Sequence, residues 1–285
     1  MAKPAYNPII GTAHPDILIG TRHSFVNPDR DGRDLIHGLA GDDTIKALSG
    51  MDTVYGGAGN DLIVDVERFQ LWWAEPRTAR AAAKDFDGYI HAGGGDDTVR
   101  VGAKGSPDAF AEFAVYGEAG DDVLLAVGQA SGQLIGGEGD DRIYLSAFGG
   151  SGRGGAGDDL VSAAPPELIG GWPGWSYYDG AAQTLDGGSG HDRLFCYGGT
   201  EDTIVFAPGY GRDVVWDFNA SPYLNETGPR DRIDLTAFDL DMTAEEFLAD
   251  HAVQRGDKVT LRPDATARLV LWDVKIEDLA DVLIL

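Results

Sequence analysis

The chain has 285 residues, 41 of them glycine, and its 22 basic and 47 acidic side chains give a formal net charge of −25. This charge excludes the basic surface of a nucleic-acid-binding protein and favours cations as partners. No stretch approaches the ~20 apolar residues of a membrane-spanning helix, so we expect no insertion into a membrane. The single cysteine, Cys196, excludes a disulfide within the chain and is expected to be a small buried side chain.

A nine-residue repeat begins near the N-terminus. Its pattern is G-G-x-G-x-D-x-U-x, in which U is a large apolar residue. A further copy at residue 20 keeps the phase but lacks the aspartate. This regularity indicates a repeat architecture rather than ordinary surface turns. Good copies begin at residues 38, 56, 92, 117, 136, 154 and 187, and weaker copies at 11, 29 and 47.

Each copy predicts a turn of about six residues followed by a strand of about three. The glycines permit positive φ and a close approach of two backbones, as a tight loop requires. Strands this short are unstable alone, so each should pair in parallel with the copies above and below it, ~4.8 Å away. The eighth position of the repeat should then point inward as a stacked aliphatic ladder. Its members are Leu18, Ile36, Ile45, Val54, Ile63, Val99, Leu124, Ile143, Val161 and Leu194.

This nonapeptide resembles the repeat of the RTX, or haemolysin-type, calcium-binding proteins. The resemblance implies an all-β fold, a right-handed parallel β-roll (a β-solenoid) in which two consecutive copies make one turn. It also implies several calcium ions, held between loops that are stacked one turn apart. Copies that begin 18 residues apart are then expected to share ions, namely 11/29, 29/47, 38/56 and 136/154.

The repeat offers the ligands that calcium prefers, because calcium takes six to eight oxygens and the loops supply carboxylates and backbone carbonyls. Without an ion, neighbouring carboxylates repel by roughly 4 kcal/mol per close pair at an effective dielectric near 20. We therefore expect calcium binding to drive folding. The predicted metal-binding residues are Asp16, Asp34, Gly38, Gly41, Asp43, Asp52, Gly56, Gly59, Asp61, Gly95, Asp97, Gly120, Asp122, Gly136, Gly139, Asp141, Gly154, Gly157, Asp159, Gly190, Asp192 and Asp213.

The fifth position of the repeat is also polar, and two interpretations stay open for it. The side chains are either solvated or additional calcium ligands. They are Asp42, Asn60, Asp96, Asp121, Asp140 and Asp158.

Two segments interrupt the repeat, near residues 65–91 and 163–186. The first predicts a short helix from Glu67 to about Ala83. The second is rich in proline, glycine and aromatic residues, which either pack on the roll or stack on a ligand such as a sugar. The candidate ligand-stacking residues are Trp172, Trp175, Tyr177 and Tyr178.

The pattern changes after residue 199, so we expect a repeat domain over 1–199 and a β-rich capping region over 200–285. Thr243 and Glu246 predict a helix start with a capping box. The final residues, DLADVLIL, resemble the uncleaved signal of type I secretion, and they suit a buried last strand equally well. The resemblance implies export through type I secretion machinery, in agreement with the lack of an N-terminal apolar run typical of a signal peptide.

No catalytic signature accompanies the repeats. None of the six histidines lies in H-E-x-x-H, and no serine lies in G-x-S-x-G. We therefore expect a secreted, non-catalytic calcium-binding protein that acts at the cell surface, in a matrix or in contact with a host. One alternative is calcium-dependent binding of a surface polysaccharide, as in the accessory modules of alginate epimerases. The other is an enzyme that uses the two interrupting segments.

Overall fold

The structure is a computed structural model that describes residues 6–21, 32–48, 50–68, 87–104, 111–128, 130–146, 148–164, 181–197, 200–220 and 229–285. The chain divides into two compact units, residues 1–138 and residues 139–285. Each unit is built mainly of parallel strands.

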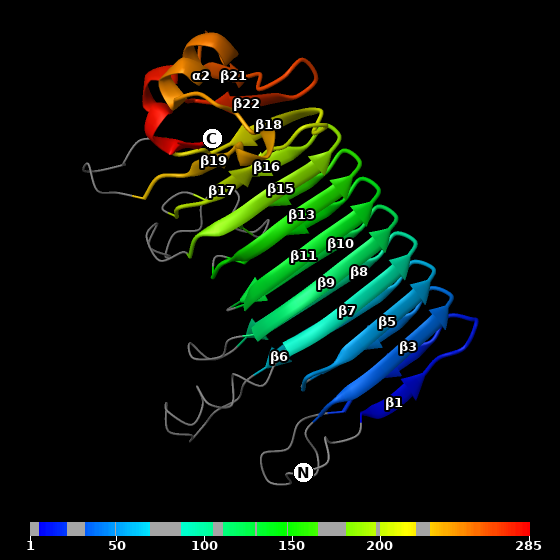
Figure 1. Cartoon of the computed structure of the whole chain (residues 1–285). Coiled ribbons are helices and arrows are strands. Elements are labelled where there is room, and N and C mark those ends of the chain that lie inside the picture. The colour runs from blue at the N-terminus through cyan, green and yellow to red at the C-terminus, as the bar shows by residue number, and fades with distance from the viewer. Residues whose placement is uncertain are drawn as a thin grey trace, which may run out of the picture. The chain divides into compact units, whose positions relative to one another are not determined.

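Unit 1 contains two parallel sheets, and successive strands alternate between them, as the colour gradient of Figure 1 shows. The first sheet has the order β1 (Asn7–Ile10), β3 (Asp34–Ala40), β5 (Thr53–Ala58), β7 (Asp87–Gly94), β9 (Ala111–Ala119) and β11 (Ala130–Glu138). The second has the order β2 (Ile17–Ile19), β4 (Thr44–Lys46), β6 (Leu62–Arg68), β8 (Thr98–Lys104) and β10 (Val123–Gly128).

The core of unit 1 is the predicted aliphatic ladder. Ile36 pairs with Val54 and Val54 with Ile90 in the first sheet, and Ile45 pairs with Ile63 in the second. All five side chains have no exposed surface. Every member of the predicted eighth-position ladder is buried, so the inward direction of this position is confirmed in both units.

Unit 2 shows the same alternation within itself. One sheet has the order β13 (Gly150–Ala156), β15 (Gln183–Ser189), β17 (Thr203–Val205), β19 (Arg232–Asp234) and β23 (Leu283–Ile284). The other has the order β12 (Arg142–Tyr144), β14 (Leu160–Ser162), β16 (Arg193–Phe195), β18 (Arg212–Trp216), β22 (Arg268–Trp272), β21 (Lys258–Leu261) and β20 (Ala252–Arg255).

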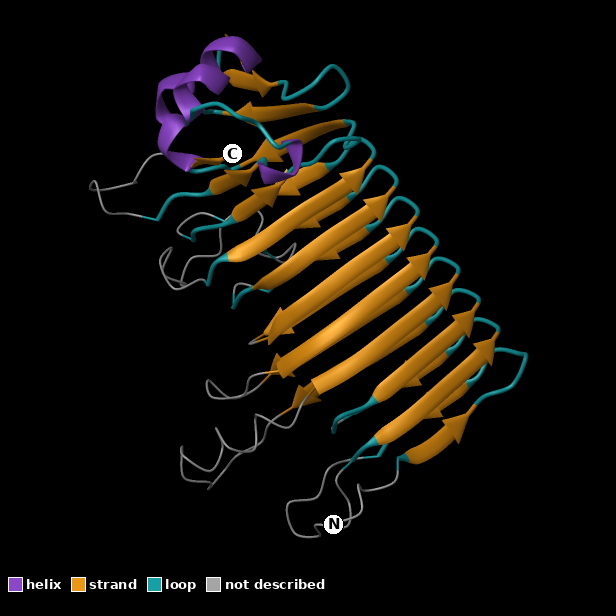
Figure 2. Cartoon of the chain, viewed as in Figure 1, coloured by secondary structure: helices purple, strands orange, loops and turns teal. Residues whose placement is uncertain are grey.

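The C-terminal end of unit 2 departs from the parallel pattern. Strands β20, β21 and β22 pair antiparallel, which ends the parallel stack and forms the expected β-rich cap. The helices of the described residues lie in the same region (Figure 2): η2 (Thr236–Phe238), α2 (Ala244–His251), η3 (Ile276–Asp278) and η4 (Ala280–Val282). None of these helices is long and apolar enough to cross a membrane.

The capping box predicted for α2 is confirmed. The Thr243 hydroxyl accepts a hydrogen bond from the backbone N–H of Glu246, and the Glu246 carboxylate accepts one from the backbone N–H of Thr243 at 2.9 Å. Phe247 and Leu248 are the buried side chains of this helix. At the end of the chain, β23 pairs with β19.

The parallel β-roll predicted from the repeat is confirmed, but two local expectations were wrong. Residues 11–16 stack on residues 38–43 rather than on the copy at 29, since the backbone N–H of Asp16 bonds to Asp43. Most of the degenerate copy at 20 and the start of the copy at 29 lie outside the described residues. Glu67 and Arg68 belong to β6 rather than to a helix, and the rest of the expected helix lies outside the described residues.

The neighbouring residues Ile63 and Leu62 test the ladder. Ile63 is fully buried and Leu62 is 40% exposed in the same strand. We expect Ile63→Ala to lower the free energy of unfolding of the calcium-loaded protein by about 2–5 kcal/mol, because it leaves a cavity in the stack. Leu62→Ala should change it by less than about 0.5 kcal/mol. Denaturant titration measures both, and equal losses would contradict an inward-facing ladder.

Candidate metal centre

The repeat loops lie on two edges of each unit. The first edge contains the loops that connect β1 to β2, β3 to β4 and the later pairs in the same way, such as residues 41–43 and 59–61. The second edge contains the connections that return the chain to the next turn, such as the one from β4 to β5. Glycines form the turns of the first edge. Gly59 has φ +124°, and a methyl group added there would overlap the Gly41 carbonyl of the preceding turn.

The sixth-position aspartates of the first edge form a hydrogen-bonded ladder. One carboxylate oxygen, Oδ1, accepts the backbone N–H of the corresponding aspartate in the turn before. In unit 1 the order is Asp16, Asp43, Asp61, Asp97 and Asp122, with N···O distances of 2.6–2.8 Å. In unit 2 the order is Asp141, Asp159, Asp192 and Asp213, with distances of 2.8–3.1 Å.

The second oxygen of these carboxylates, Oδ2, is where the ladder can hold a cation. Among the described residues, Oδ2 of Asp43, Asp61, Asp97, Asp159 and Asp192 is buried and has no hydrogen-bond partner. A buried carboxylate oxygen without a partner is costly unless a cation or a proton neutralises it.

The first glycine of each repeat completes an oxygen-lined hollow. A methyl group added at Gly38 would overlap both Oδ2 of Asp43 and the carbonyl oxygen of Gly56 in the next turn. The same pair of oxygens surrounds Gly154, from Asp159 and Gly187. Carboxylate and carbonyl oxygens around a glycine are the donor set of a hard cation, so these residues fit calcium.

The pKa values of the ladder aspartates reflect the cost of burying their negative charges close together. Burial raises the pKa of Asp97 to about 7 against the pull of a backbone N–H, and the charges of Asp122 and Asp61 raise it further. Burial and then the charge of Asp192 raise the pKa of Asp213 to about 8. Burial likewise raises the pKa of Asp159 to about 7. In the calcium-free roll, the ladder therefore favours protonation, and a bound cation would remove that preference.

The fifth-position side chains are exposed, as one of the two interpretations expected, but they also bridge turns. Each side-chain oxygen accepts the backbone N–H of the equivalent residue in the next turn. Asp42 accepts from Asn60 at 2.9 Å, and Asn60 from Asp96 at 3.0 Å. In unit 2, Asp140 accepts from Asp158 at 2.8 Å, and Asp158 from His191 at 2.9 Å.

The second edge of unit 1 repeats the ladder on a smaller scale. Asp52 Oδ1 accepts the backbone N–H of Asp34 at 2.8 Å. Oδ2 of Asp34 accepts the backbone N–H of Thr21, so the protein itself satisfies this oxygen. Copies 29 and 47 are therefore stacked as expected, and so are 38/56 and 136/154.

The second edge of unit 2 holds residues that the repeat pattern did not single out. Cys196, Asp202 and Asp231 are buried, with one ligand-type atom of each within 4.8 Å of the others. Both oxygens of each carboxylate already accept backbone N–H groups, from Gln183 and Tyr197 for Asp202, and from Asp202 and Asn219 for Asp231. The protein itself therefore satisfies this cluster. Burial raises the pKa of the Cys196 thiol, and the predicted burial of Cys196 is confirmed.

A weak sequence signal could have found Asp202. It lies two residues before Ile204, which is fully buried, and this is the Asp-x-apolar spacing of the repeats. The fourth-position glycine is missing from that segment, so the copy does not match the full pattern.

The first turn also differs from the other turns. Oδ2 of Asp16 accepts hydrogen bonds from the backbone N–H and the hydroxyl of Thr12, at 2.6 and 2.9 Å. Trp172, Trp175, Tyr177 and Tyr178 lie outside the described residues. Most of the other predicted positions lie in the repeat loops. Those that lie within strands are Asp34, Gly38, Gly56, Gly136, Gly154 and Asp213.

A parallel β-roll whose loops present carboxylate and carbonyl oxygens defines a class of calcium-binding solenoid. A family model described as the RTX calcium-binding nonapeptide repeat (4 copies) matches residues 30–63 and 128–152. The chain therefore contains RTX-type nonapeptide repeats, and these repeats bind calcium ions.

Two other comparisons add little to this assignment. A structural comparison matches the extracellular lipase LipA from Serratia marcescens at 18% sequence identity and a TM-score of 0.30. The match covers 100% of this chain, which spans 41% of the lipase. A TM-score this low supports no inference about fold or activity. The comparison with curated proteins found no match.

The raised pKa values predict that acid partly replaces calcium. The carboxyl pKa of Asp97 is about 7 in the calcium-free roll and 3.8 in the reference state. Between about pH 4 and pH 8, the folded calcium-free state thus holds more protons than the unfolded chain, and its stability falls as pH rises. Circular dichroism in calcium-depleted buffer should show more β-structure at about pH 5 than at about pH 8. The opposite trend would contradict the shifts.

Asp61 and Asp42 test which aspartates hold ions. Asp61 lies between Asp43 and Asp97 in the ladder, whereas the exposed Asp42 only accepts a backbone hydrogen bond. We expect Asp61→Asn to reduce the number of bound ions by at least one. Asp42→Asn should leave that number unchanged, because its amide oxygen can still accept the bond. Calorimetric calcium titration counts the ions, and an equal loss in both variants would assign ligation to the fifth position.

Proposed function

We propose that the chain is a secreted, calcium-conditioned β-roll that folds when it meets calcium outside the cell. The observation that carries the proposal is the first-edge ladder, in which buried carboxylates lie one above another in each unit. Their mutual repulsion and desolvation oppose folding, and calcium would reverse both effects. Calcium binding energy then becomes folding energy.

Secretion from the cell would explain why folding depends on calcium. Extracellular calcium modules bind with dissociation constants of about 0.1–1 mM. Sites of that affinity stay empty in calcium-poor cytosol, so the chain would remain unfolded for passage through a type I secretion channel. The acidic and apolar C-terminal residues that resemble a secretion signal support this proposal. In the folded roll, Leu283 and Ile284 of this segment pair as β23 with β19.

The proposed role is non-catalytic and lies at the cell surface, in a matrix or in contact with a host. The environments of two histidines support this view. His91 stacks between Tyr55 and Tyr116, and Nδ1 of His251 donates a hydrogen bond to the Arg262 carbonyl oxygen. Both contacts are of a structural kind.

A chelation experiment tests the proposal. In excess chelator at neutral pH, the far-ultraviolet circular dichroism spectrum should lose its β-sheet signal, and calcium should restore it cooperatively. Magnesium serves as the matched control, because its near-octahedral preference suits these shared loops poorly. An unchanged, folded spectrum in chelator, or equal recovery with magnesium, would overturn the proposal.

A further inference from the structure

The outer face of the β1–β11 sheet in unit 1 carries a continuous row of aromatic side chains. Strand pairing aligns Ile10, His37, Tyr55, His91, Tyr116 and Ile135 across the sheet. The four rings stack with centroid separations of 4.7, 5.2 and 4.8 Å. Because each ring covers its neighbour, this aromatic row presents ring edges with hydroxyl groups and imidazole nitrogens.

A first hollow of about 420 Å³ lies on one side of the aromatic row. Its most exposed aromatic side chain is Tyr89, which is 53% exposed and makes no ring contact among the described residues, and Tyr116 of the row also lines it. Tyr89 pairs with Ala114, and Ala114 with Gln133, so a small side chain separates the tyrosine from an exposed amide. Glu112 and Ser131 add polar groups at the same hollow.

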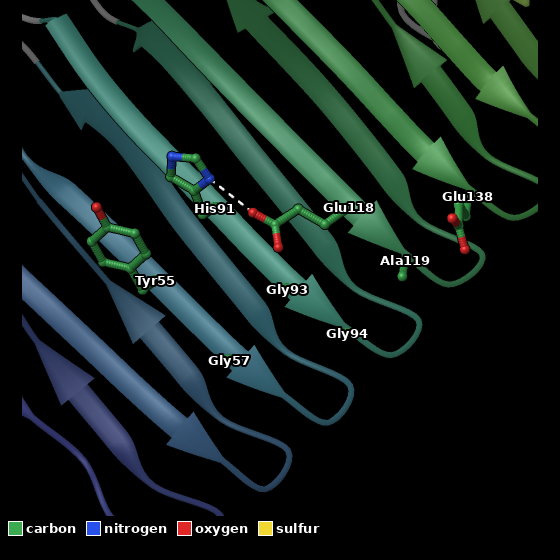
Figure 3. Close-up of a pocket in the computed structure, with 8 residues that line it drawn as sticks. All are labelled: Tyr55, Gly57, His91, Gly93, Gly94, Glu118, Ala119 and Glu138. Atoms are coloured by element: carbon green, nitrogen blue, oxygen red, sulfur yellow. Dashed lines mark hydrogen bonds and ion pairs between the residues drawn. The ribbon is translucent and has the colours of Figure 1, made fainter.

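A second hollow of about 460 Å³ is lined by Tyr55 and His91 of the row and by residues that follow them along the strands (Figure 3). Its floor is made of Gly57 and Gly93, and its polar wall is Glu118, which bonds to Nδ1 of His91 at 2.8 Å. Glu118 is aligned with glycines on both sides, Gly93 and Gly137, and has φ +81°. The position suits glycine, so the carboxylate stands there against the backbone preference.

Together these features point to a saccharide site. Ligand sites typically have volumes of about 300–1,000 Å³, with an aromatic surface and a few placed polar groups. A free tyrosine face suits the C–H face of a sugar ring, and the carboxylate, amide and hydroxyl groups around it suit sugar hydroxyls. The exposed carboxylates of Glu112, Glu118 and Glu138, in a chain of charge −25, disfavour an anionic sugar.

We propose that this face binds an uncharged oligosaccharide across β7 and β9. Ala114 in the first hollow and Glu118 in the second lie on the same strand, four residues apart, or roughly 13 Å. A sugar chain that crosses the aromatic row can therefore reach both hollows, whereas a single sugar occupies one. The site needs a folded roll, so its occupancy rests on the calcium-driven folding proposed above.

The experiment titrates the full chain in saturating calcium with uncharged hexaoses of glucose, mannose, galactose and N-acetylglucosamine. A uronate hexamer is the anionic comparison. We expect at least one uncharged hexaose to bind and the uronate not to bind. Tyr89→Ala should weaken binding by about tenfold or more, and Tyr89→Phe should keep it within about twofold, because the ring face remains. Leu62→Ala, on the other sheet, is the matched surface control.

The variant Glu118→Gly distinguishes a loss of oligosaccharide binding from a loss of protein stability. Glycine tolerates φ +81°, so the thermal midpoint should stay the same or rise while hexaose affinity falls. Circular dichroism of every variant in calcium shows that the roll is folded, which distinguishes failure of this proposal from failure of calcium-driven folding. The proposal is overturned if no uncharged hexaose binds the folded chain, or if Tyr89→Ala binds like the parent. It is equally overturned if Trp172→Ala, rather than Tyr89→Ala, abolishes binding.

Discussion

Stacked carboxylates are the constraint on which this protein depends. Strands of three residues, such as β2 and β4, are stable only when each pairs with a copy above or below it. The repeat that supplies the buried apolar residue also supplies the aspartate two positions before it. Stacking one therefore stacks the other, and Asp43 comes to lie against Asp61. The same nine-residue repeat therefore supplies both the apolar side chain whose burial stabilises the stack and the carboxylate whose repulsion destabilises it.

The two oxygen atoms of a ladder carboxylate have different roles. One oxygen of Asp97 accepts a backbone N–H of the preceding turn, which fixes the loop register. The other oxygen is buried and among the described residues has no partner, which creates the requirement for a cation. A neutral amide could perform the first task, as Asn60 does at the fifth position. Only a charged group performs the second, so the aspartate side chain couples register to metal binding.

On the second edge of unit 2, backbone N–H groups satisfy the buried carboxylates in place of a cation. Asp202 and Asp231 are as deeply buried as the first-edge aspartates, but both oxygens of each accept backbone N–H groups. Longer connections supply the additional donors there, from Tyr197 and Asn219. The contrast indicates that a buried aspartate in this fold does not by itself mark a calcium ligand. The distinguishing feature is the oxygen that remains unpaired.

The nonapeptide by itself determined the roll, the inward ladder and the loops that present oxygen atoms, because every local preference repeats in one phase. It also located the pairing of Asp43 with Asp61, where the spacing is 18 residues and uninterrupted. Sequence spacing could not place Asp16 against Asp43 or Asp61 against Asp97, 27 and 36 residues apart. The nonapeptide pattern does not specify the lengths of the connections between turns. The outer face was likewise decided by tertiary structure, since only strand pairing aligns Tyr55 with His91 and leaves Tyr89 beside Ala114.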